Sequence, residues 1–146
     1  MRVRDVLKTK GGRMITIGPD ATVREAVARM VENNIGSLPV VEPDGSLVGV
    51  ISERDLMREL HDRGDQFSRA MIRAVMTLDP ITCDIDDEVE TVMGQMTEKR
   101  IAKVPVTDRG RLAGIVSVGD VVKLLYERTQ AENHHLMDYL YGPAHT

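Results

Sequence analysis

A repeated stretch constrains this chain more than any other feature of its sequence. GVISERD, at Gly49–Asp55, returns 65 positions later as GIVSVGD, at Gly114–Asp120. Each copy is an apolar, strand-like run that ends in Ser-x-x-Asp and continues with a helix-like pattern. Because internal repeats of this kind form the same structural unit each time, the fold must be built from two similar halves.

The two halves share one predicted order of elements, β-α-β-β-α. In the first half we expect a strand at Met14–Ile17, a helix after the capping-box pair Thr22 and Glu25, strands at Leu38–Val41 and Ser46–Ile51, and a helix near Glu53–Asp62. In the second half we expect a strand at Ile81–Cys83, a helix capped by Asp87 with Glu90, strands at Val104–Thr107 and Arg111–Val116, and a helix near Val118–Glu132.

The predicted fold class is therefore α/β (α+β), with two tandem repeats packed sheet to sheet in pseudo-twofold symmetry. A half of about 50 residues is marginal alone, whereas two halves can share one core. We place repeat 1 at residues 1–63 and repeat 2 at 75–128. Between them, 64–74 form a linker that leads into a helical pattern at Phe67–Met76, and 129–146 form a less regular C-terminal tail.

Composition excludes several classes of function. The net charge of −4 argues against broad nucleic-acid binding, which requires a basic surface. The single cysteine, Cys83, excludes an intramolecular disulfide framework and a cysteine-rich zinc site, and the histidines show no metal-ligand spacing. No apolar run has the length of a membrane span, and the N-terminus lacks the apolar core of a secretory signal. We expect a cytoplasmic protein with no metal site.

The repeated serine and aspartate allow two interpretations. Ser52 with Asp55, and Ser117 with Asp120, can be helix caps, since a serine before a helix bonds its first amides and an aspartate suits its dipole. Alternatively, an exposed helix N-terminus binds anions, and a carboxylate there can accept hydrogen bonds from two vicinal ribose hydroxyls. Together, these groups are the minimum for a nucleotide site.

The full doubled pattern resembles the CBS domain, the family named after cystathionine β-synthase. The resemblance rests on both Gly-x-x-Ser-x-x-Asp ends and on the upstream Leu38-Pro39-Val40 and Val104-Pro105-Val106, and it covers roughly Val6 to Tyr126. Two tandem copies resemble a CBS pair, or Bateman module. The segments MTEKRI, GRLAGIVSVGDVVK and SERD are similar to the small stand-alone CBS-pair proteins of bacteria and plants.

The resemblance implies a regulatory, non-enzymatic module that binds an adenosine-type ligand in the cleft between the repeats. AMP is the first candidate, and NAD, ATP, ADP and S-adenosylmethionine are the others. Ligand would change the angle between repeats or between chains. The resemblance also favours a homodimer acting on a regulated protein that the sequence does not identify, with no membrane partner. The alternative is a structural or protein-interaction module with no physiological ligand.

The resemblance also implies roles for individual residues. Asp55 and Asp120 would bind ribose hydroxyls, and Ser52 and Ser117 would lie near the phosphate. Backbone groups facing adenine would come from Thr16, Ile17, Thr82 and Cys83, and the opposite wall would be formed by Ser37, Leu38, Pro39, Lys103, Val104 and Pro105.

Two arginines could add a phosphate clamp. Arg54 and Arg58 share a helix face, and they are either solvated surface with salt bridges or, by resemblance, arms for a ligand held by the other repeat. The second copy has Val118 and Gly119 where the first has Glu53 and Arg54. We therefore expect the two sites to be unequal, and an empty site in one repeat is one form that this difference could take. Lys103 stands where relatives often have histidine, and it could reach a phosphate but could not stack on a base.

Overall fold

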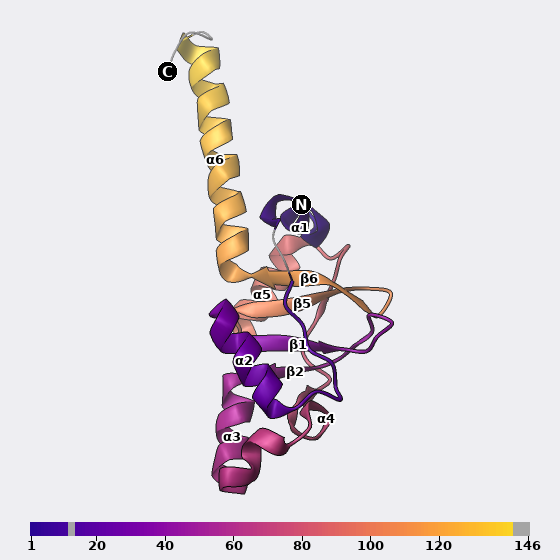
Figure 1. The fold of residues 1–146 in the computed structure, drawn as a ribbon. Coiled ribbons are helices and arrows are strands. Elements are labelled where there is room, and N and C mark those ends of the chain that lie inside the picture. Colours follow the sequence, from indigo (N-terminus) through magenta and orange to yellow (C-terminus); the bar gives the residue numbers. More distant parts are fainter. Residues whose placement is uncertain (12–13, 142–146) are drawn as a thin grey trace. The chain divides into compact units, whose positions relative to one another are not determined.

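The computed structural model describes residues 1–11 and 14–141, which form two compact units. Unit 1 comprises Met1–Gly11, Asp86–Val104 and Ile115–Thr146, and unit 2 comprises Gly12–Ile85 and Pro105–Gly114. The chain alternates helices with short strands (Figure 1), which agrees with the α/β class predicted from the repeats.

Unit 2 holds most of the first repeat. Its elements are α2 (Val23–Asn33), β1 (Ser37–Val41), β2 (Leu47–Ser52), α3 (Glu53–Arg63), the 3-10 helix η1 (Gly64–Arg69), α4 (Ile72–Val75), β3 (Thr77–Leu78) and β4 (Cys83–Asp84). Unit 1 contains α1 (Val3–Lys10), α5 (Val89–Lys99) and α6 (Val118–Tyr141). The strands β5 (Lys103–Asp108) and β6 (Arg111–Ser117) contribute residues to both units.

Two three-stranded sheets, ordered β1-β2-β3 and β4-β5-β6, confirm the duplicated strand pattern. The strand expected at Met14–Ile17 is reduced to a single parallel bridge, Ile17 with Val40. Its counterpart is the parallel pairing of Cys83 with Val106 in β4 and β5, where each residue lies 66 positions after its equivalent. The two repeats therefore start with the same pairing, although only the second extends it into a strand.

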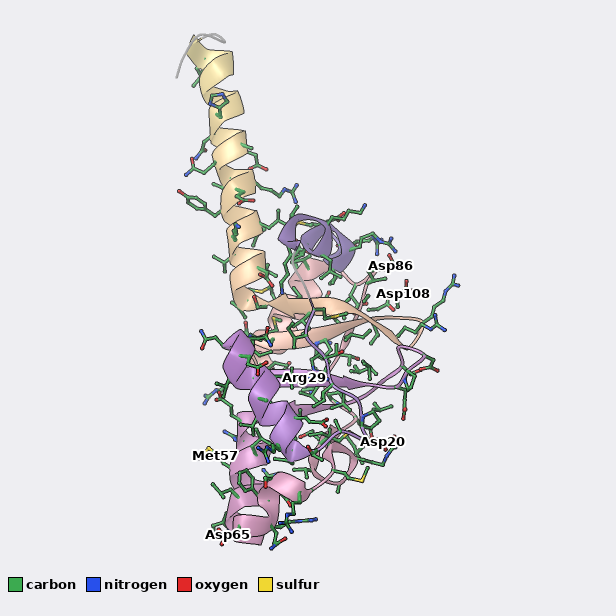
Figure 2. The ribbon with its side chains drawn as sticks, in the orientation of Figure 1. Asp20, Arg29, Met57, Asp65, Asp86 and Asp108 are labelled. Carbon is green, nitrogen blue, oxygen red and sulfur yellow. The ribbon has the colours of Figure 1, made fainter. Side chains whose placement is uncertain are left out.

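The core of unit 2 lies between its sheet and its helices. The fully buried apolar side chains come from α2, β1, β2 and α4, and they are joined by Ile17. In α2 the buried Val23, Ala26 and Met30 recur at helical spacing, while Arg29 on the same helix is exposed (Figure 2). Thr22 caps α2 by accepting a bond from the Glu25 amide at 3.2 Å, which is one half of the predicted capping box.

The hairpin turns of the two repeats hydrogen-bond to each other within unit 2. The Leu47 amide donates to the Gly110 carbonyl at 3.2 Å, and the Leu112 amide donates to the Gly45 carbonyl at 3.0 Å. Gly45 and Gly110 both have positive φ, of 91° and 81°, which glycine adopts without steric cost. The turn residues therefore serve two purposes, because they reverse each hairpin and also pair the two turns.

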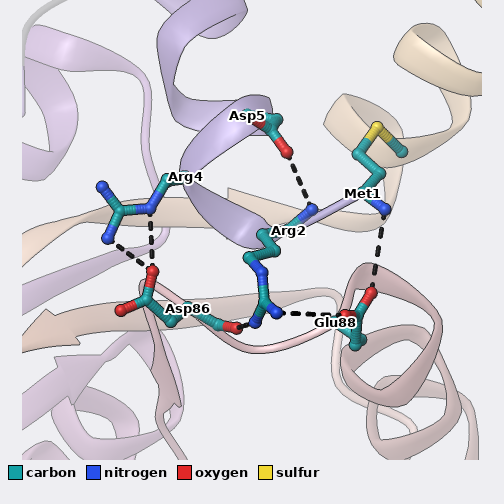
Figure 3. A network of polar contacts seen from close by, with 6 residues as sticks. All are labelled: Met1, Arg2, Arg4, Asp5, Asp86 and Glu88. Atoms are coloured by element: carbon teal, nitrogen blue, oxygen red, sulfur yellow. Dashed lines mark hydrogen bonds and ion pairs between the residues drawn. The ribbon is translucent and has the colours of Figure 1, made fainter.

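A short N-terminal helix, α1, belongs to unit 1 and was not predicted. Its buried side chains are Val3 and Val6, and both α1 and α5 pack against α6. At its start, the Val3 amide donates to the Asp87 carbonyl and the Val89 amide donates to the Met1 carbonyl, at 2.9 and 3.0 Å. Figure 3 shows the polar network around these bonds, which joins Met1, Arg2, Arg4, Asp5, Asp86 and Glu88.

The contacts between the N-terminal residues and the start of α5 explain why the prediction of a capping box at Asp87 and Glu90 is wrong. Helix α5 begins one residue later than that pattern implies, at Val89, with Glu88 in the N-cap position. The Glu88 carboxylate faces Arg2 and the N-terminal amine, at 3.7 Å from each, instead of bonding its own helix. Because the N-terminal amine and Arg2, just before α1, lie next to this turn, the Glu88 carboxylate forms long-range ion pairs instead of a side-chain cap.

The ends of the predicted helices also differ from expectation. The helical pattern at Phe67–Met76 is split, because η1 ends at Arg69 and α4 begins at Ile72. Helix α6 runs to Tyr141, well past the expected Glu132, so much of the tail is helical (Figure 1). Residues 127–134 along this helix are exposed. None of the helices in the described part of the chain is both long and apolar enough to span a membrane.

One glycine of the repeated motif has a clear packing role. A Cβ added at Gly49 would lie 2.7 Å from the Thr77 carbonyl oxygen and 2.9 Å from the Met76 sulfur. Gly49 pairs with Leu78 across β2 and β3, so the obstructing atom is backbone that the sheet holds in place. The absence of a side chain at Gly49 is what lets β3 approach β2.

We therefore expect Gly49→Ala to destabilise the protein by about 1–3 kcal/mol, because the methyl group must displace β3. Gly94→Ala is the matched control, since nothing lies within 4 Å of the added Cβ on α5, and it should stabilise by about 0.5–1 kcal/mol through helix propensity. Urea unfolding of both variants measures the effects. Equal stability of Gly49→Ala and wild type would contradict this account of the motif.

Candidate functional site

Both Ser-x-x-Asp pairs form reciprocal helix caps. The Ser52 amide donates to Asp55 Oδ2 at 2.8 Å, and the Asp55 amide donates to Ser52 Oγ at 3.3 Å. In the second repeat the Ser117 amide donates to Asp120 Oδ2, and the Asp120 amide donates to Ser117 Oγ, both at 3.0 Å. The capping interpretation therefore holds for both repeats, since each serine and aspartate bonds the other's backbone.

The first amide of each helix is also bonded to the protein. The Glu53 amide donates to the Gly36 carbonyl, and the Val118 amide donates to the Ala102 carbonyl, each at 3.0 Å. Together with the caps, these bonds use most of the amides that a helix N-terminus leaves unpaired. An anion at either helix end would therefore find fewer free amides than the motif alone suggests, and side chains become more important for binding.

In the first repeat, the aspartate is enclosed by protein donors. The side chain of Asp55 is only 5% exposed. Its Oδ2 accepts from Ser52 Oγ at 2.9 Å, and its Oδ1 accepts from Thr77 Oγ1 at 3.0 Å. Arg58 Nη1 lies 3.9 Å from Oδ1, so its guanidinium forms a long ion pair with this carboxylate. Both oxygens of Asp55 are thus already bonded within unit 2.

Backbone groups expected to face adenine in the first repeat are bonded as well. The Ile17 amide donates to the Pro39 carbonyl at 3.0 Å, and the Ile17 carbonyl accepts from the Val41 amide at 2.9 Å. The Thr16 carbonyl accepts a bond from the guanidinium of Arg29. Adenine could use these groups only by replacing bonds that the protein makes itself.

The aspartate of the second repeat lies in a different environment. The Asp120 side chain is 24% exposed, and Lys10 Nζ, from the last turn of α1, lies 2.9 Å from its Oδ2. The same ammonium donates to the Ile115 carbonyl at 2.7 Å. Among the described residues, the bonds that Asp120 accepts all end on Oδ2. The Asp120 carboxylate is therefore partly accessible, with its Oδ2 held by Lys10 and by the Ser117 amide.

A small cavity adjoins Asp120 within unit 1. Its volume is about 90 Å³, and it is lined by Val6, Thr9, Lys10, Asp120, Lys123, Leu124 and Glu127. Lys10 and Lys123 place two cations in the wall of this cavity, which also contains the carboxylates of Asp120 and Glu127. Hence repeat 2 has positive charge near its carboxylate although it lacks a counterpart of Arg54, and that charge comes from residues outside the repeated motif.

The bonds around Asp120 change its acidity. Partial burial alone would raise the pKa of Asp120, but the hydrogen bonds from Lys10 and Ser117 outweigh burial and hold the pKa below its usual value. Asp120 is therefore ionised at neutral pH, in the state that accepts hydrogen bonds from hydroxyl groups.

The remaining predicted residues are divided between the units. In unit 2, Arg54, Arg58 and Thr82 are exposed, Ser37 is half-buried, and Leu38, Pro39, Cys83 and Pro105 are buried. In unit 1, Lys103 is exposed and Val104 is buried. The structure thus brings Ser52, Asp55 and Arg58 together in unit 2, and Ser117 with Asp120 in unit 1.

Sequence reasoning missed Thr77 and Lys10, the residues that make the two aspartates different. Thr77 follows Asp55 by 22 positions, at the start of the second repeat, and Lys10 lies 110 positions before Asp120. Neither belongs to the repeated motif, so the repeat could not identify them. Within the part of the chain that the structure describes, no group of three or more His, Cys, Asp or Glu side chains is placed to hold a metal ion.

The lowered pKa of Asp120 predicts how acid affects stability. Because the pKa is lower in the folded protein than in the unfolded chain, ionised Asp120 stabilises the fold above an unfolded pKa of about 3.9. That contribution is lost as pH falls through the folded pKa, so Asp120→Asn should differ most from wild type at pH 7. The difference should shrink as pH falls below about 5.

Urea unfolding of wild type and Asp120→Asn at a series of pH values measures this difference. Lys10→Met removes the partner instead of the acid, and it should flatten the same part of the pH profile. A stability difference between wild type and Asp120→Asn that stays constant with pH would show that the Lys10–Asp120 pair contributes nothing to folding.

Comparison with known proteins agrees with this geometry. The CBS domain family matches residues 3–62 and 72–127 of the chain. The chain is 33% identical over 148 residues to the CBS domain-containing protein CBSX3, mitochondrial, of Arabidopsis thaliana, covering 96% of this chain and 72% of that protein. Several other curated relatives are longer, and the chain spans less than half of their length.

Solved structures agree in fold. The CBS-domain containing protein ATU1752 from Agrobacterium tumefaciens matches with a TM-score of 0.73 and 35% identity, covering 85% of this chain and 98% of that one. The CBS domain pair of protein MJ0100, solved in complex with 5′-methylthioadenosine and S-adenosyl-L-methionine, matches with a TM-score of 0.70 and 30% identity, covering 88% and 98%. With both repeats matched and both serine–aspartate caps in place, the chain belongs to the CBS domain family and carries a CBS domain pair.

Proposed function

We propose that this chain is a non-catalytic regulatory module that binds an adenosine-type ligand through Asp120. The observation that carries the proposal is the contrast between the two aspartates, because Asp55 is enclosed by protein donors whereas Asp120 is accessible beside a cavity. An ionised carboxylate at a helix start can accept bonds from both hydroxyls of a ribose. The complex of the MJ0100 pair with adenosine-type molecules supports this class of ligand.

AMP is the ligand we propose first, with NAD, ATP, ADP and S-adenosylmethionine as the other candidates. The phosphate of AMP would need cations in place of free helix amides, since the first amides of α6 are bonded to Ala102 and Ser117. Lys10 and Lys123 lie in the wall of the cavity and are suited to that task. Cellular adenylates are plentiful, so a dissociation constant in the micromolar to millimolar range, about −4 to −8 kcal/mol, would suffice.

Titration calorimetry with AMP, ATP, NAD and S-adenosylmethionine tests the proposal. Asp120→Asn should weaken binding by about tenfold or more, because hydrogen bonds to a charged group contribute about 1.5–3 kcal/mol. Asp55→Asn is the matched control in the other repeat, and it should lower stability while leaving affinity nearly unchanged. Failure of every compound to bind wild type would favour the alternative, a structural module with no physiological ligand.

The module is also proposed to act as a homodimer through an apolar face on α2 and α3. Val31 and Met57 are 75% and 71% exposed, and Leu60 is 50% exposed (Met57 is labelled in Figure 2). Val31 also lines a groove of about 380 Å³, whose other lining residues are Val27, Met30, Asn34, Ile35, Glu53 and Leu56. Exposed apolar surface of this kind marks an interaction site, and a second copy supplies a self-complementary partner.

Met57→Asp should convert a dimer into a monomer, because the introduced charge would lose its water at the interface without gaining a partner. Val122→Asp is the matched control, since Val122 is an exposed apolar residue on α6, outside this face. Light scattering after size exclusion measures the mass of each protein. A monomeric wild type, or a dimeric Met57→Asp, would overturn the proposed interface.

A further inference from the structure

The ribose-binding carboxylate proposed above already has a partner in the protein. Lys10 Nζ lies 2.9 Å from Asp120 Oδ2, which is the length of a charge-assisted hydrogen bond. Lys10 ends helix α1, and its ammonium also donates to the Ile115 carbonyl at 2.7 Å, on the strand that leads to Ser117. The side chains of Lys10 and Asp120 are 35% and 24% exposed, so water only partly screens the pair.

The space beside the pair is too small for a nucleoside. The adjoining cavity of about 90 Å³ holds a few water molecules, each of which occupies about 30 Å³, whereas small-molecule pockets usually measure about 300 Å³ or more. Lys10 is one of the residues that line the cavity. A ligand that approaches Asp120 from this side must therefore move the Lys10 side chain.

Helix α1 is held firmly at the opposite end, so Lys10 remains close to Asp120 when its side chain moves. Arg4 Nε donates to Asp86 Oδ1 at 2.8 Å, Arg2 bonds the Asp86 carbonyl, and Val3 and Val6 are buried (Figure 3). A lysine tethered in this way is present at a high effective concentration and competes with any free ligand.

We propose that Lys10 is an internal competitor for the ligand site, which occupies Asp120 in the unliganded protein and must be displaced by the hydroxyls of the ligand. The inference rests on the proposed function, because it assumes that Asp120 receives a ribose. When Lys10 occupies the site, only the fraction of molecules with an open site can bind ligand. The apparent affinity is reduced in proportion to that fraction. Lys10 therefore sets the concentration at which the module responds.

Adenosine is the probe that isolates this effect, because it carries ribose hydroxyls but no phosphate to attract the displaced ammonium. Calorimetry should show that Lys10→Met binds adenosine about threefold to tenfold more tightly than wild type, since a partly exposed ion pair no longer has to be broken. Lys8→Met is the matched control, because it removes the same charge from an exposed position on the same helix. Its affinity for adenosine should equal that of wild type.

Two further measurements test the mechanism. 2′,3′-Dideoxyadenosine lacks the hydroxyls, so Lys10→Met should bind it no better than wild type does. Raising the salt concentration weakens the Lys10–Asp120 pair but does not affect a neutral ligand directly. Salt should therefore strengthen adenosine binding to wild type and leave Lys10→Met unchanged.

The outcomes separate this inference from the proposed function. If AMP binds wild type but adenosine binds Lys10→Met no better than wild type, or not at all, the competition is overturned and the proposed function stands. If neither AMP nor adenosine binds wild type or Lys10→Met, the proposed function is overturned, and so is the inference that Lys10 competes with the ligand. If adenosine binds Lys10→Met alone, the competition is supported in its strongest form.

Discussion

The reciprocal bond between serine and aspartate at the end of each central hairpin is the interaction on which the rest of the structure depends. It stops β2 and β6 and starts α3 and α6, because the side chain of each residue bonds the backbone of the other. The next amide is bonded to the carbonyl of the residue just before the first strand of the same hairpin, which is Gly36 before β1 or Ala102 before β5. Each carboxylate is thereby held at a strand end, where a small difference in surroundings decides what it can bind.

Those surroundings differ because each repeat is covered by a different segment. In unit 2, Gly49 lets β3 approach β2, and β3 brings the Thr77 hydroxyl to Asp55. In unit 1, α1 brings Lys10 to Asp120. The Thr77 hydroxyl completes a buried cap around Asp55, whereas the Lys10 ammonium makes a partly exposed contact with Asp120. This difference is why we propose Asp120, and not Asp55, as the ligand-binding carboxylate.

Much of the fold could be predicted from the repeated residues alone. The spacing of the motif, the turns around Gly45 and Gly110 and the helical pattern of α2 all depend on neighbours in sequence, so they can be read locally. The caps at Ser52 and Ser117 were predictable for the same reason. The serine and aspartate of each candidate site followed directly from the repeat.

The rest depended on contacts between distant residues. Helix α1 is short, has few apolar positions and is stabilised by Asp86 and by packing on α6, so its own sequence gives little signal. The cap expected at Asp87 failed because Arg2 and the N-terminal amine attract Glu88. In the same way, nothing in the motif indicates that Thr77 encloses Asp55 or that Lys10 reaches Asp120.

We propose that Asp120, and not Asp55, is the carboxylate that receives a ligand. A crystal structure of the protein grown with AMP tests this assignment most directly, because the position of the ribose can be seen. We predict ribose hydroxyls within hydrogen-bonding distance of Asp120, with Lys10 moved from Oδ2 and the Asp55–Thr77 bond intact. A ribose bound at Asp55, with the Lys10–Asp120 pair unchanged, would contradict it.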